Sequence, residues 1–211
     1  MPGIFLTIEG PDGGGKTSQV QLLAAQLEKR GIHYIKTREP GGTAISDKIR
    51  ELLLNPDSKD MDSKTEALLY AASRAQLVAE VIRPALQKGY VVICDRYMDA
   101  SIAYQGALGL HHDDVRMINE FATDCLRPDR TYLLDIRPEE GLKRIQRAKR
   151  AEFCGDLDRI EQRALAYHNR VREQFLRIAK ERGSQYVVLD GEQPKDIVAE
   201  SIWSDFSTFL N

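Results

Sequence analysis

Apolar residues recur along the chain in five short runs that have the length of β-strands. The runs are residues 4–9, 32–37, 90–94, 131–136 and 185–189. The segments between them are long and carry amphipathic helical patterns. Such connections cross from one end of a sheet to the other, so they predict a parallel sheet with helices on both faces. The predicted fold class is therefore α/β.

Two of the connecting segments show where their helices begin. The first follows the first apolar run, and its apolar positions recur at helical spacing: Val20, Leu23, Ala24 and Leu27. The second opens at residues 63–66 with Ser-Lys-Thr-Glu, which has the form of a capping box, and runs to about Lys88, with a bend expected at Pro84. No repeat or linker-like tract interrupts the chain, so a single domain is expected over residues 1–211.

Composition and charge narrow the class of protein. The chain is 42% hydrophobic and 29% charged, with a formal net charge of -2. This balance argues against nucleic acid or an anionic membrane as the main partner, because both require broad positive surfaces. Cys94, Cys125 and Cys154 are too widely spaced for a zinc or redox motif and are expected to be thiols. With no signal-peptide or membrane-span pattern, we expect a cytoplasmic protein.

The residues after the first apolar run match the phosphate-binding P-loop in full. The motif reads Gly10, Pro11, Asp12, Gly13, Gly14, Gly15, Lys16 and Thr17. In this motif the glycines let backbone N–H groups face the phosphates, the lysine reaches the β- and γ-phosphates, and the threonine hydroxyl ligates Mg²⁺. The helix that follows would point its positive end at the same phosphates. We therefore predict a nucleotide-binding site for ATP and Mg²⁺.

The P-loop alone predicts the ligand and not the reaction. The Asn-Lys-x-Asp motif of guanine-specific GTPases does not occur in the chain. Large ATPases commonly have paired acidic residues after a strand, whereas the third run here is followed by Asp95-Arg96-Tyr97. At the carboxyl end of a parallel strand, Asp95 can hold Mg²⁺ or its waters and Arg96 can bind a second phosphate group. Two phosphate-binding centres indicate phosphoryl transfer between two phosphates. The alternative for Asp95 and Arg96 is an ion pair at the end of the strand that is exposed to solvent.

Four segments together resemble the thymidylate kinase family, whose members phosphorylate deoxythymidine monophosphate (dTMP) with ATP. They are the P-loop and residues 37–43 (TREPGGT), 66–76 (EALLYAASRAQ) and 95–106, which begins Asp-Arg-Tyr and ends Ser-Ile-Ala-Tyr-Gln-Gly. The resemblance covers nearly the whole chain. It implies a P-loop NTPase fold with a five-stranded parallel sheet, a lid at about residues 143–157, dTMP as the acceptor and a homodimer built on helices. It also implies that the Glu39-Pro40 bond is cis.

The same resemblance implies which residues hold the acceptor nucleotide. Arg50, Arg74 and Arg96 are expected to bind it, with Arg96 and Arg50 at its phosphate. Asp12 is expected near the 3′-hydroxyl of the acceptor sugar, where a carboxylate accepts a hydrogen bond from a free hydroxyl. Glu39 is expected nearby.

Three further positions are implied to recognise the base. Tyr70 takes the aromatic position that packs on the thymine ring, and Ser101 and Gln105 take positions that read the polar edge of the pyrimidine. Tyr70, Arg74 and Gln105 also have structural interpretations. Tyr70 could belong to the core, Arg74 could cover it, and Gln105 could cap a turn.

A basic run at residues 143–150 marks the expected lid. It reads Lys-Arg-Ile-Gln-Arg-Ala-Lys-Arg, and helical spacing puts Lys143, Arg147 and Arg150 on one face. Such a run can be a solvated helix face, but it lies where thymidylate kinases have a mobile lid. Some members have an arginine in the P-loop where this chain has Gly13, so the lid is expected to supply that charge. Arg147 and Arg150 are the candidate catalytic arginines.

Phosphoryl transfer depends on alignment and charge neutralisation more than on proton removal. The acceptor phosphate is already ionised at neutral pH, so no general base is required. Lys16, Arg96, Mg²⁺ and a lid arginine are expected to stabilise the transferring group. Two other functions stay open at this point. A deoxynucleoside kinase would require a carboxylate base near the 5′-hydroxyl, and a non-catalytic nucleotide-binding protein would lack a complete acceptor site.

Overall fold

A computed structural model describes residues 3–152 and 157–210 of the chain. Within them lies a parallel sheet of five strands in the order β2-β3-β1-β4-β5. The strands are β1 (Ile4–Glu9), β2 (Tyr34–Arg38), β3 (Val91–Asp95), β4 (Arg130–Asp135) and β5 (Tyr186–Asp190). Each begins and ends within two residues of a predicted run. The predicted α/β class and its five-stranded parallel sheet are confirmed.

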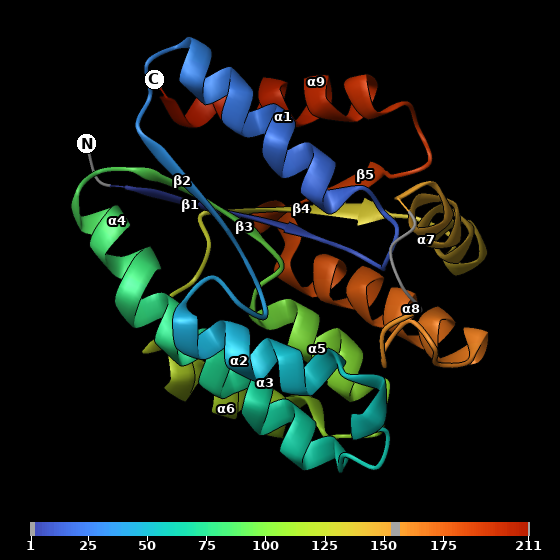
Figure 1. Ribbon diagram of the computed structural model, residues 1–211. Coiled ribbons are helices and arrows are strands. Elements are labelled where there is room, and N and C mark those ends of the chain that lie inside the picture. The colour runs from blue at the N-terminus through green and yellow to red at the C-terminus, as the bar shows by residue number, and fades with distance from the viewer. Residues whose placement is uncertain (1–2, 153–156, 211) are drawn as a thin grey trace.

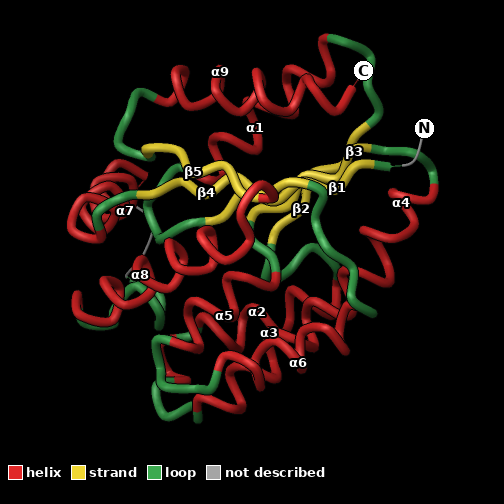
Figure 2. Tube along the Cα trace, turned by 180° about the vertical axis from the view of Figure 1, so that it is seen from behind, coloured by secondary structure: helices red, strands yellow, loops and turns green. Residues whose placement is uncertain are grey.

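Helices cover both faces of the sheet (Figure 1). On one face lie α1 (Lys16–Lys29) and α9 (Lys195–Phe206). On the other lie α2 (Ala44–Leu54), α3 (Ser63–Leu77), α4 (Arg83–Gln87), α5 (Met98–Gly106), α6 (His112–Thr123) and α8 (Leu165–Arg182). The basic run lies in α7 (Pro138–Glu152), at the edge where the strands end. Figure 2 shows the same layers from behind.

Strand β1 lies at the centre of the sheet, between β3 and β4, and pairs in parallel with both. Ile8 pairs in register with Asp95 of β3 and Tyr132 of β4. Its alternate side chains enter two different cores: Leu6 and Ile8 pack under α1 and α9, and Phe5 packs beneath the segment around α4. Burial on both faces explains why the run is almost continuously apolar.

The segment between β2 and β3 departs from the prediction at its first helix. The N-cap of α3 is Asp62, whose carboxylate accepts a hydrogen bond from the backbone N–H of Lys64. The predicted capping box at Ser63 is therefore wrong. Glu66 does not reach back to the helix start, because its buried carboxylate is bound by arginines from a distant part of the chain.

The long helical pattern that ends near Lys88 is interrupted before Pro84. Residues Val78–Ile82 form a π-helical turn in which the N–H of Arg83 bonds to the carbonyl of Val78. Proline has no N–H and its ring clashes with the carbonyl four residues earlier. The hydrogen bonds of the helix therefore span five residues instead of four at this point. Three short 3₁₀ turns complete the described helical structure: Pro56–Ser58, Gly183–Gln185 and Ser207–Leu210.

Two other sequence expectations concern the backbone and the membrane. The Glu39-Pro40 peptide bond is cis. In the described part of the chain, no helix has both the length and the apolar character needed to cross a bilayer. The cytoplasmic location stays a prediction.

Candidate active site

The P-loop joins β1 to α1 in a backbone conformation that favours glycine. Gly10, Gly13 and Gly15 have φ angles of 136°, 76° and 86°. Lys16 opens the helix, and its Nζ atom donates a hydrogen bond to the carbonyl of Pro11 at 2.7 Å. The lysine is thus held against the concave side of the loop, where it can reach a bound phosphate.

Gly13 also lies against the start of α7. A Cβ atom built at Gly13 would lie 2.2 Å from the carbonyl oxygen of Gly141, and one built at Gly141 would lie 2.2 Å from the carbonyl oxygen of Asp12. Neither residue has room for a side chain. In this chain, the close contact with Gly141 therefore excludes an arginine at position 13 on packing grounds, in addition to the difference in charge.

The two predicted magnesium-binding residues lie together. The Thr17 hydroxyl donates a hydrogen bond to Oδ2 of Asp95 at 2.6 Å. Asp95 ends β3, beside the strand that leads into the P-loop. No group of three or more His, Cys, Asp or Glu side chains arranged for a metal occurs in the described residues. A site for Mg²⁺ needs no such group, because this ion is commonly held by one or two protein oxygens with phosphates and water.

Arg96 follows Asp95 with a φ angle of 71°, in the left-handed region. Its backbone N–H bonds to the carbonyl of Ile8 at 3.0 Å, and the next N–H, of Tyr97, bonds to Oε1 of Glu9 at 2.7 Å. A left-handed arginine is strained and persists only where its surroundings fix it. These two bonds to β1 fix the turn that directs Arg96 toward the P-loop.

The Arg96 guanidinium joins the P-loop to α5. It donates to the carbonyl of Gly10 at 2.8 Å, to Oδ1 of Asp12 at 2.5 Å and to the hydroxyl of Tyr104 at 2.9 Å. Tyr104 in turn donates to Oδ2 of Asp12 at 2.8 Å. Burial alone would raise the pKa of Asp12, but Arg96 and Lys16 outweigh it and lower that pKa. The carboxylate is therefore held ionised.

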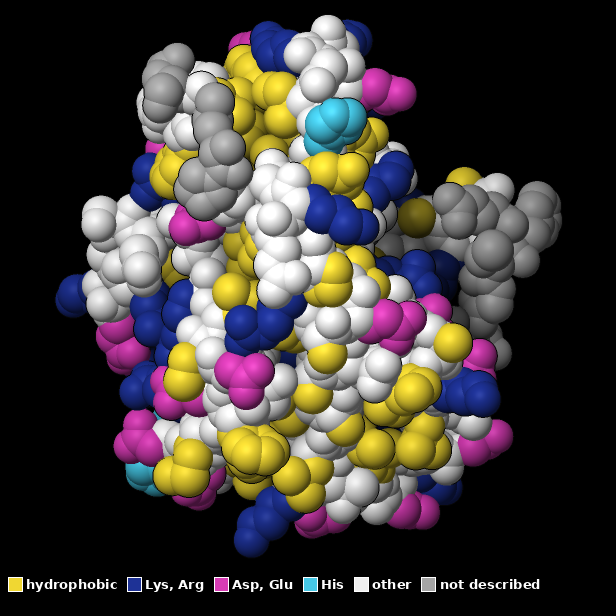
Figure 3. Space-filling model, turned by 90° about the vertical axis from the view of Figure 1, so that its left-hand side faces the viewer, with side chains coloured by type: hydrophobic (Ala, Val, Ile, Leu, Met, Phe, Trp, Pro, Cys, Tyr) yellow, Lys and Arg dark blue, Asp and Glu magenta, His cyan; other side chains and the backbone are white. Residues whose placement is uncertain are grey.

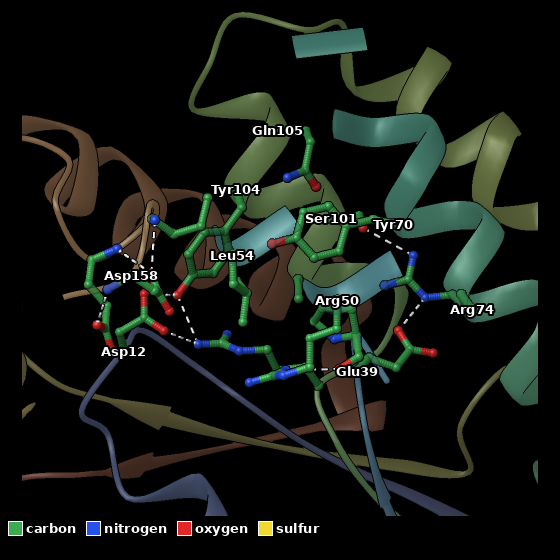
Figure 4. Close-up of a pocket in the computed structure, with 15 residues that line it drawn as sticks. Asp12, Glu39, Arg50, Leu54, Tyr70, Arg74, Ser101, Tyr104, Gln105 and Asp158 are labelled. Carbon is green, nitrogen blue, oxygen red and sulfur yellow. Dashed lines mark hydrogen bonds and ion pairs between the residues drawn. The ribbon is translucent and has the colours of Figure 1, made fainter. Parts of the chain in front are cut away.

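An inner pocket of about 100 Å³ lies beside this group and shares part of its wall with a wider cleft of about 710 Å³ at the P-loop. All of the predicted substrate-binding residues line the inner pocket: Asp12, Glu39, Arg50, Tyr70, Arg74, Arg96, Ser101 and Gln105. In Figure 4, Asp12 and Tyr104 lie at one side, Glu39 and Arg74 at the other, and Gln105 above them. The fold thus brings together residues from five segments.

Arg74 forms part of the pocket wall and is 1% exposed. Its Nε atom pairs with Oε2 of Glu39 at 2.5 Å, and its other nitrogens donate to the Ser101 hydroxyl, the Asn119 side chain and the Tyr97 carbonyl. Burial raises the pKa of Glu39 although Arg74 opposes the shift. Arg74 therefore fixes its neighbours in the wall as well as lining the pocket.

Sequence reasoning missed several residues of the same pocket. Tyr104 and Leu54 line it, as does the turn that contains Asp158, Ile160 and Glu161. Tyr104 lies within a segment that carries the family resemblance, so spacing along α5 could have identified it. The residues of the turn have no local signal, because only the fold brings them to the pocket.

The predicted lid is described only in part. Lys149 pairs with Glu161 at 2.6 Å, which ties α7 to the pocket turn. Arg147 and Arg150 are exposed on α7. Arg144 instead donates to the carbonyl of Gly191 at 2.8 Å and lines a cleft of about 610 Å³ along the P-loop. Residues 153–156 of the expected lid lie outside the described residues.

Comparison with known proteins identifies the chain's relatives. The family model described as Thymidylate kinase matches residues 8–202. The thymidylate kinase of Exiguobacterium sibiricum is 49% identical over 211 residues, which cover 100% of this chain and 97% of that protein. That of Clostridium novyi is 46% identical over 201 residues, with 95% and 96% covered.

A solved structure agrees with these sequences. The crystal structure of thymidylate kinase from Ehrlichia chaffeensis matches with a TM-score of 0.77 at 30% identity, covering 98% of this chain and 99% of that one. The predicted P-loop NTPase fold is confirmed by this match. From its family model, its relatives and its fold, the chain belongs to the thymidylate kinase family.

Proposed function

We propose that this chain transfers the γ-phosphoryl group of ATP to dTMP and so forms dTDP and ADP. The observation that carries the proposal is the joining of two anion sites by Arg96. The two terminal nitrogens of its guanidinium bind the P-loop, one at the Gly10 carbonyl and one at the Asp12 carboxylate, and the same side chain lines the acceptor pocket. An acceptor phosphate bound there would face the donor phosphates held by the P-loop.

The donor would occupy the P-loop and the cleft beside it. Lys16 and the loop N–H groups suit the phosphates, and the cleft lined by Arg144 and Gln193 suits the remainder of the nucleotide. Thr17 and Asp95 would hold Mg²⁺, which when bound neutralises charge on the phosphates. Lys16 and Arg96 are the proposed catalytic residues, together with Arg147 or Arg150 from α7.

The acceptor would occupy the inner pocket with its phosphate toward Arg96 and Arg50. An oxygen of that phosphate bonds to the γ-phosphorus as the bond to the ADP oxygen breaks, so no proton has to be removed by the protein. Tyr70, Ser101 and Gln105 line the part of the pocket proposed for the base. Asp12, held ionised, is suited to accept a hydrogen bond from the 3′-hydroxyl.

The test is a panel of acceptors. The protein is mixed with ATP, Mg²⁺ and each nucleoside or nucleoside monophosphate in turn, and the phosphorylated product is identified by chromatography. We expect dTDP from dTMP at the highest kcat/KM. Phosphorylation of thymidine but not of dTMP would refute the proposal in favour of a nucleoside kinase, and transfer to no acceptor would indicate a binding protein.

We also propose that two copies of the chain associate through α2, α3 and α6. These helices pack side by side and expose large apolar side chains: Ile45, Leu52, Leu68, Met117 and Phe121. Figure 3 shows apolar side chains gathered at the lower end of the molecule, where this helical layer lies. An apolar patch that spans three helices is typical of an interface, and a second copy would bury it.

A further inference from the structure

A buried carboxylate outside the expected site contacts one of the proposed base-reading residues. Glu66 on α3 is 0% exposed. Its Oε2 atom pairs with Arg159 at 2.7 Å and with Arg163 at 2.6 Å. Its Oε1 atom accepts a hydrogen bond from Nε2 of Gln105 at 2.8 Å. The carboxylate is thus shared between two guanidinium groups and one amide.

Helix periodicity explains why this carboxylate lies next to the pocket. Glu66, Tyr70 and Arg74 are spaced by four residues, so they follow one another along one face of α3. That face meets α5, where Ser101 and Gln105 are also four residues apart. Arg74 bonds to Ser101 and Glu66 bonds to Gln105, which makes two polar links across the helix pair. Tyr70 lies between them along α3.

The link to Glu66 determines which way the Gln105 amide faces. A carboxylate paired with two guanidinium groups only accepts hydrogen bonds, so the amide must turn its nitrogen toward Glu66. The amide oxygen then faces away from it. Oε1 of Gln105 is buried, has no hydrogen-bond partner among the described residues, and belongs to a side chain that lines the acceptor pocket. Figure 4 shows the amide directed toward Ser101 and Tyr70.

We propose that Glu66 is a specificity-determining positioning residue that orients the Gln105 amide. With Oε1 held toward the pocket, Gln105 accepts a hydrogen bond from a base whose N3 atom carries a proton, as in thymine and uracil. Cytosine has an acceptor lone pair at N3, which would face the lone pairs of Oε1, and an unpaired acceptor in a buried site is costly. The inference rests on the proposed binding of dTMP in this pocket.

The experiment compares three nucleotides across a double-mutant cycle. Glu66→Gln, Gln105→Ala and the double variant are assayed for kcat/KM with dTMP, dUMP and dCMP, using the inhibition constant of dCMP where turnover is too slow. In Glu66→Gln the two amides can pair in either orientation, so Gln105 can turn its nitrogen into the pocket. We expect the preference for dTMP over dCMP to fall about tenfold, equivalent to roughly 1.4 kcal/mol.

The preference for dTMP over dUMP is the matched control. Both bases carry the N3 proton, so this ratio should stay at the wild-type value in Glu66→Gln. In the Gln105→Ala background, Glu66→Gln should not change the dCMP ratio further, because Glu66 acts through Gln105. Equal losses of kcat/KM for all three nucleotides in Glu66→Gln would overturn the proposal. If Gln105→Ala itself leaves every ratio unchanged, the assignment of the base pocket fails instead.

Loss of the carboxylate leaves Arg159 and Arg163 without their partner, so Glu66→Gln could fail to fold. Glu66→Asp keeps the charge and shortens the reach to Gln105, and it should lower the dCMP discrimination while the thermal midpoint stays closer to that of the wild type. A folded Glu66→Asp variant with unchanged discrimination would overturn the proposal. In the wild-type protein, the Gln105 side-chain NH₂ group should give resolved NMR signals that exchange slowly with solvent; rapid averaging would contradict an oriented amide.

Discussion

At the scale of single residues, the site depends on groups that fix functional side chains as much as on those side chains. Arg96 could be predicted from the sequence, because a basic residue after a parallel strand reaches the ligand. Its left-handed backbone could not be predicted, nor could the role of Glu9 beneath it. In the sequence, Glu9 is only the last residue of a predicted strand. Its contact with the N–H of Tyr97 depends on the register between β1 and β3.

The pKa of Glu9 gives a prediction about stability. Burial raises this pKa from 4.5 to about 8, despite the opposing charge of Arg96. Between these values the folded protein binds a proton that the unfolded chain has lost, so this group's contribution to the free energy of unfolding falls as pH rises and levels off above about pH 8. Glu9→Gln removes the titration and keeps an acceptor for Tyr97. We expect its unfolding free energy, relative to wild type, to increase from about pH 5 to about pH 8.

Urea denaturation of both proteins across this pH range provides the measurement. All other titrating groups are common to the two proteins and cancel in the difference. A difference that does not change with pH would show that Glu9 titrates alike in the folded and unfolded chains.

At the scale of elements, the contact between the P-loop and α7 requires two glycines. Gly141→Ala should favour the helix by about 1 kcal/mol on propensity alone. Its Cβ would nevertheless lie 2.2 Å from the carbonyl oxygen of Asp12, so the loop has to shift. Displacing reacting groups by about 1 Å can cost about a hundredfold in rate, and we expect kcat/KM to fall by about that factor. Steady-state kinetics with varied ATP provide the test.

Gln146→Ala on the same helix is the control for that variant, because it also introduces alanine into α7 but at an exposed position. Its kinetics should match those of wild type. If Gly141→Ala shows wild-type kinetics, the P-loop and α7 can separate without a change in ATP binding or turnover.

The arginines of α7 give a prediction that separates binding from transfer. Arg144 faces the cleft beside the P-loop, so Arg144→Ala should mainly raise the KM for ATP. A lid arginine that stabilises the transferring group should instead lower kcat by about 10² to 10³ with little change in ATP affinity. We expect this behaviour from Arg147→Ala or Arg150→Ala, with Lys143→Ala as the charge-matched control. Equal losses of binding and turnover would contradict a transfer role.

The elements themselves could be predicted where local pattern decides them. The strands were predicted to within two residues. The inner strands β1, β3 and β4 are buried almost throughout and are marked by their own composition, and the least buried strand, β2, shows the largest offset. The π-helical turn at Val78–Ile82 was not predicted, since the sequence marks only the proline that follows it. The cap at Asp62 was assigned one residue late because Ser63 also fits the capping pattern.

At the scale of the whole molecule, the fold determines which distant residues meet. The residues that the family resemblance implied for the acceptor, from Asp12 to Gln105, all line one pocket, and their role in binding stays a prediction. The family motifs did not predict the link from Glu66 to Arg159 and Arg163, because that ion pair joins α3 to the chain after α7. A single domain over residues 1–211 stays a prediction, as does the cytoplasmic location.

Association of two copies is the last prediction at this scale. Phe121 on α6 is 88% exposed and Met117, one turn earlier, is 67% exposed; α6 packs against α3, where Leu68 is 55% exposed. Phe121→Asp would put a charge into the proposed interface, where an unpaired carboxylate is costly to bury. Ile197→Asp on α9 is the matched control, because Ile197 is 50% exposed on the opposite side of the sheet. In sedimentation velocity over a range of concentrations, wild type and Ile197→Asp should behave as dimers and Phe121→Asp as a monomer. A wild-type monomer at every concentration would contradict the proposed dimer. A dimer that only Ile197→Asp disrupts would show that the interface does not lie on α3 and α6.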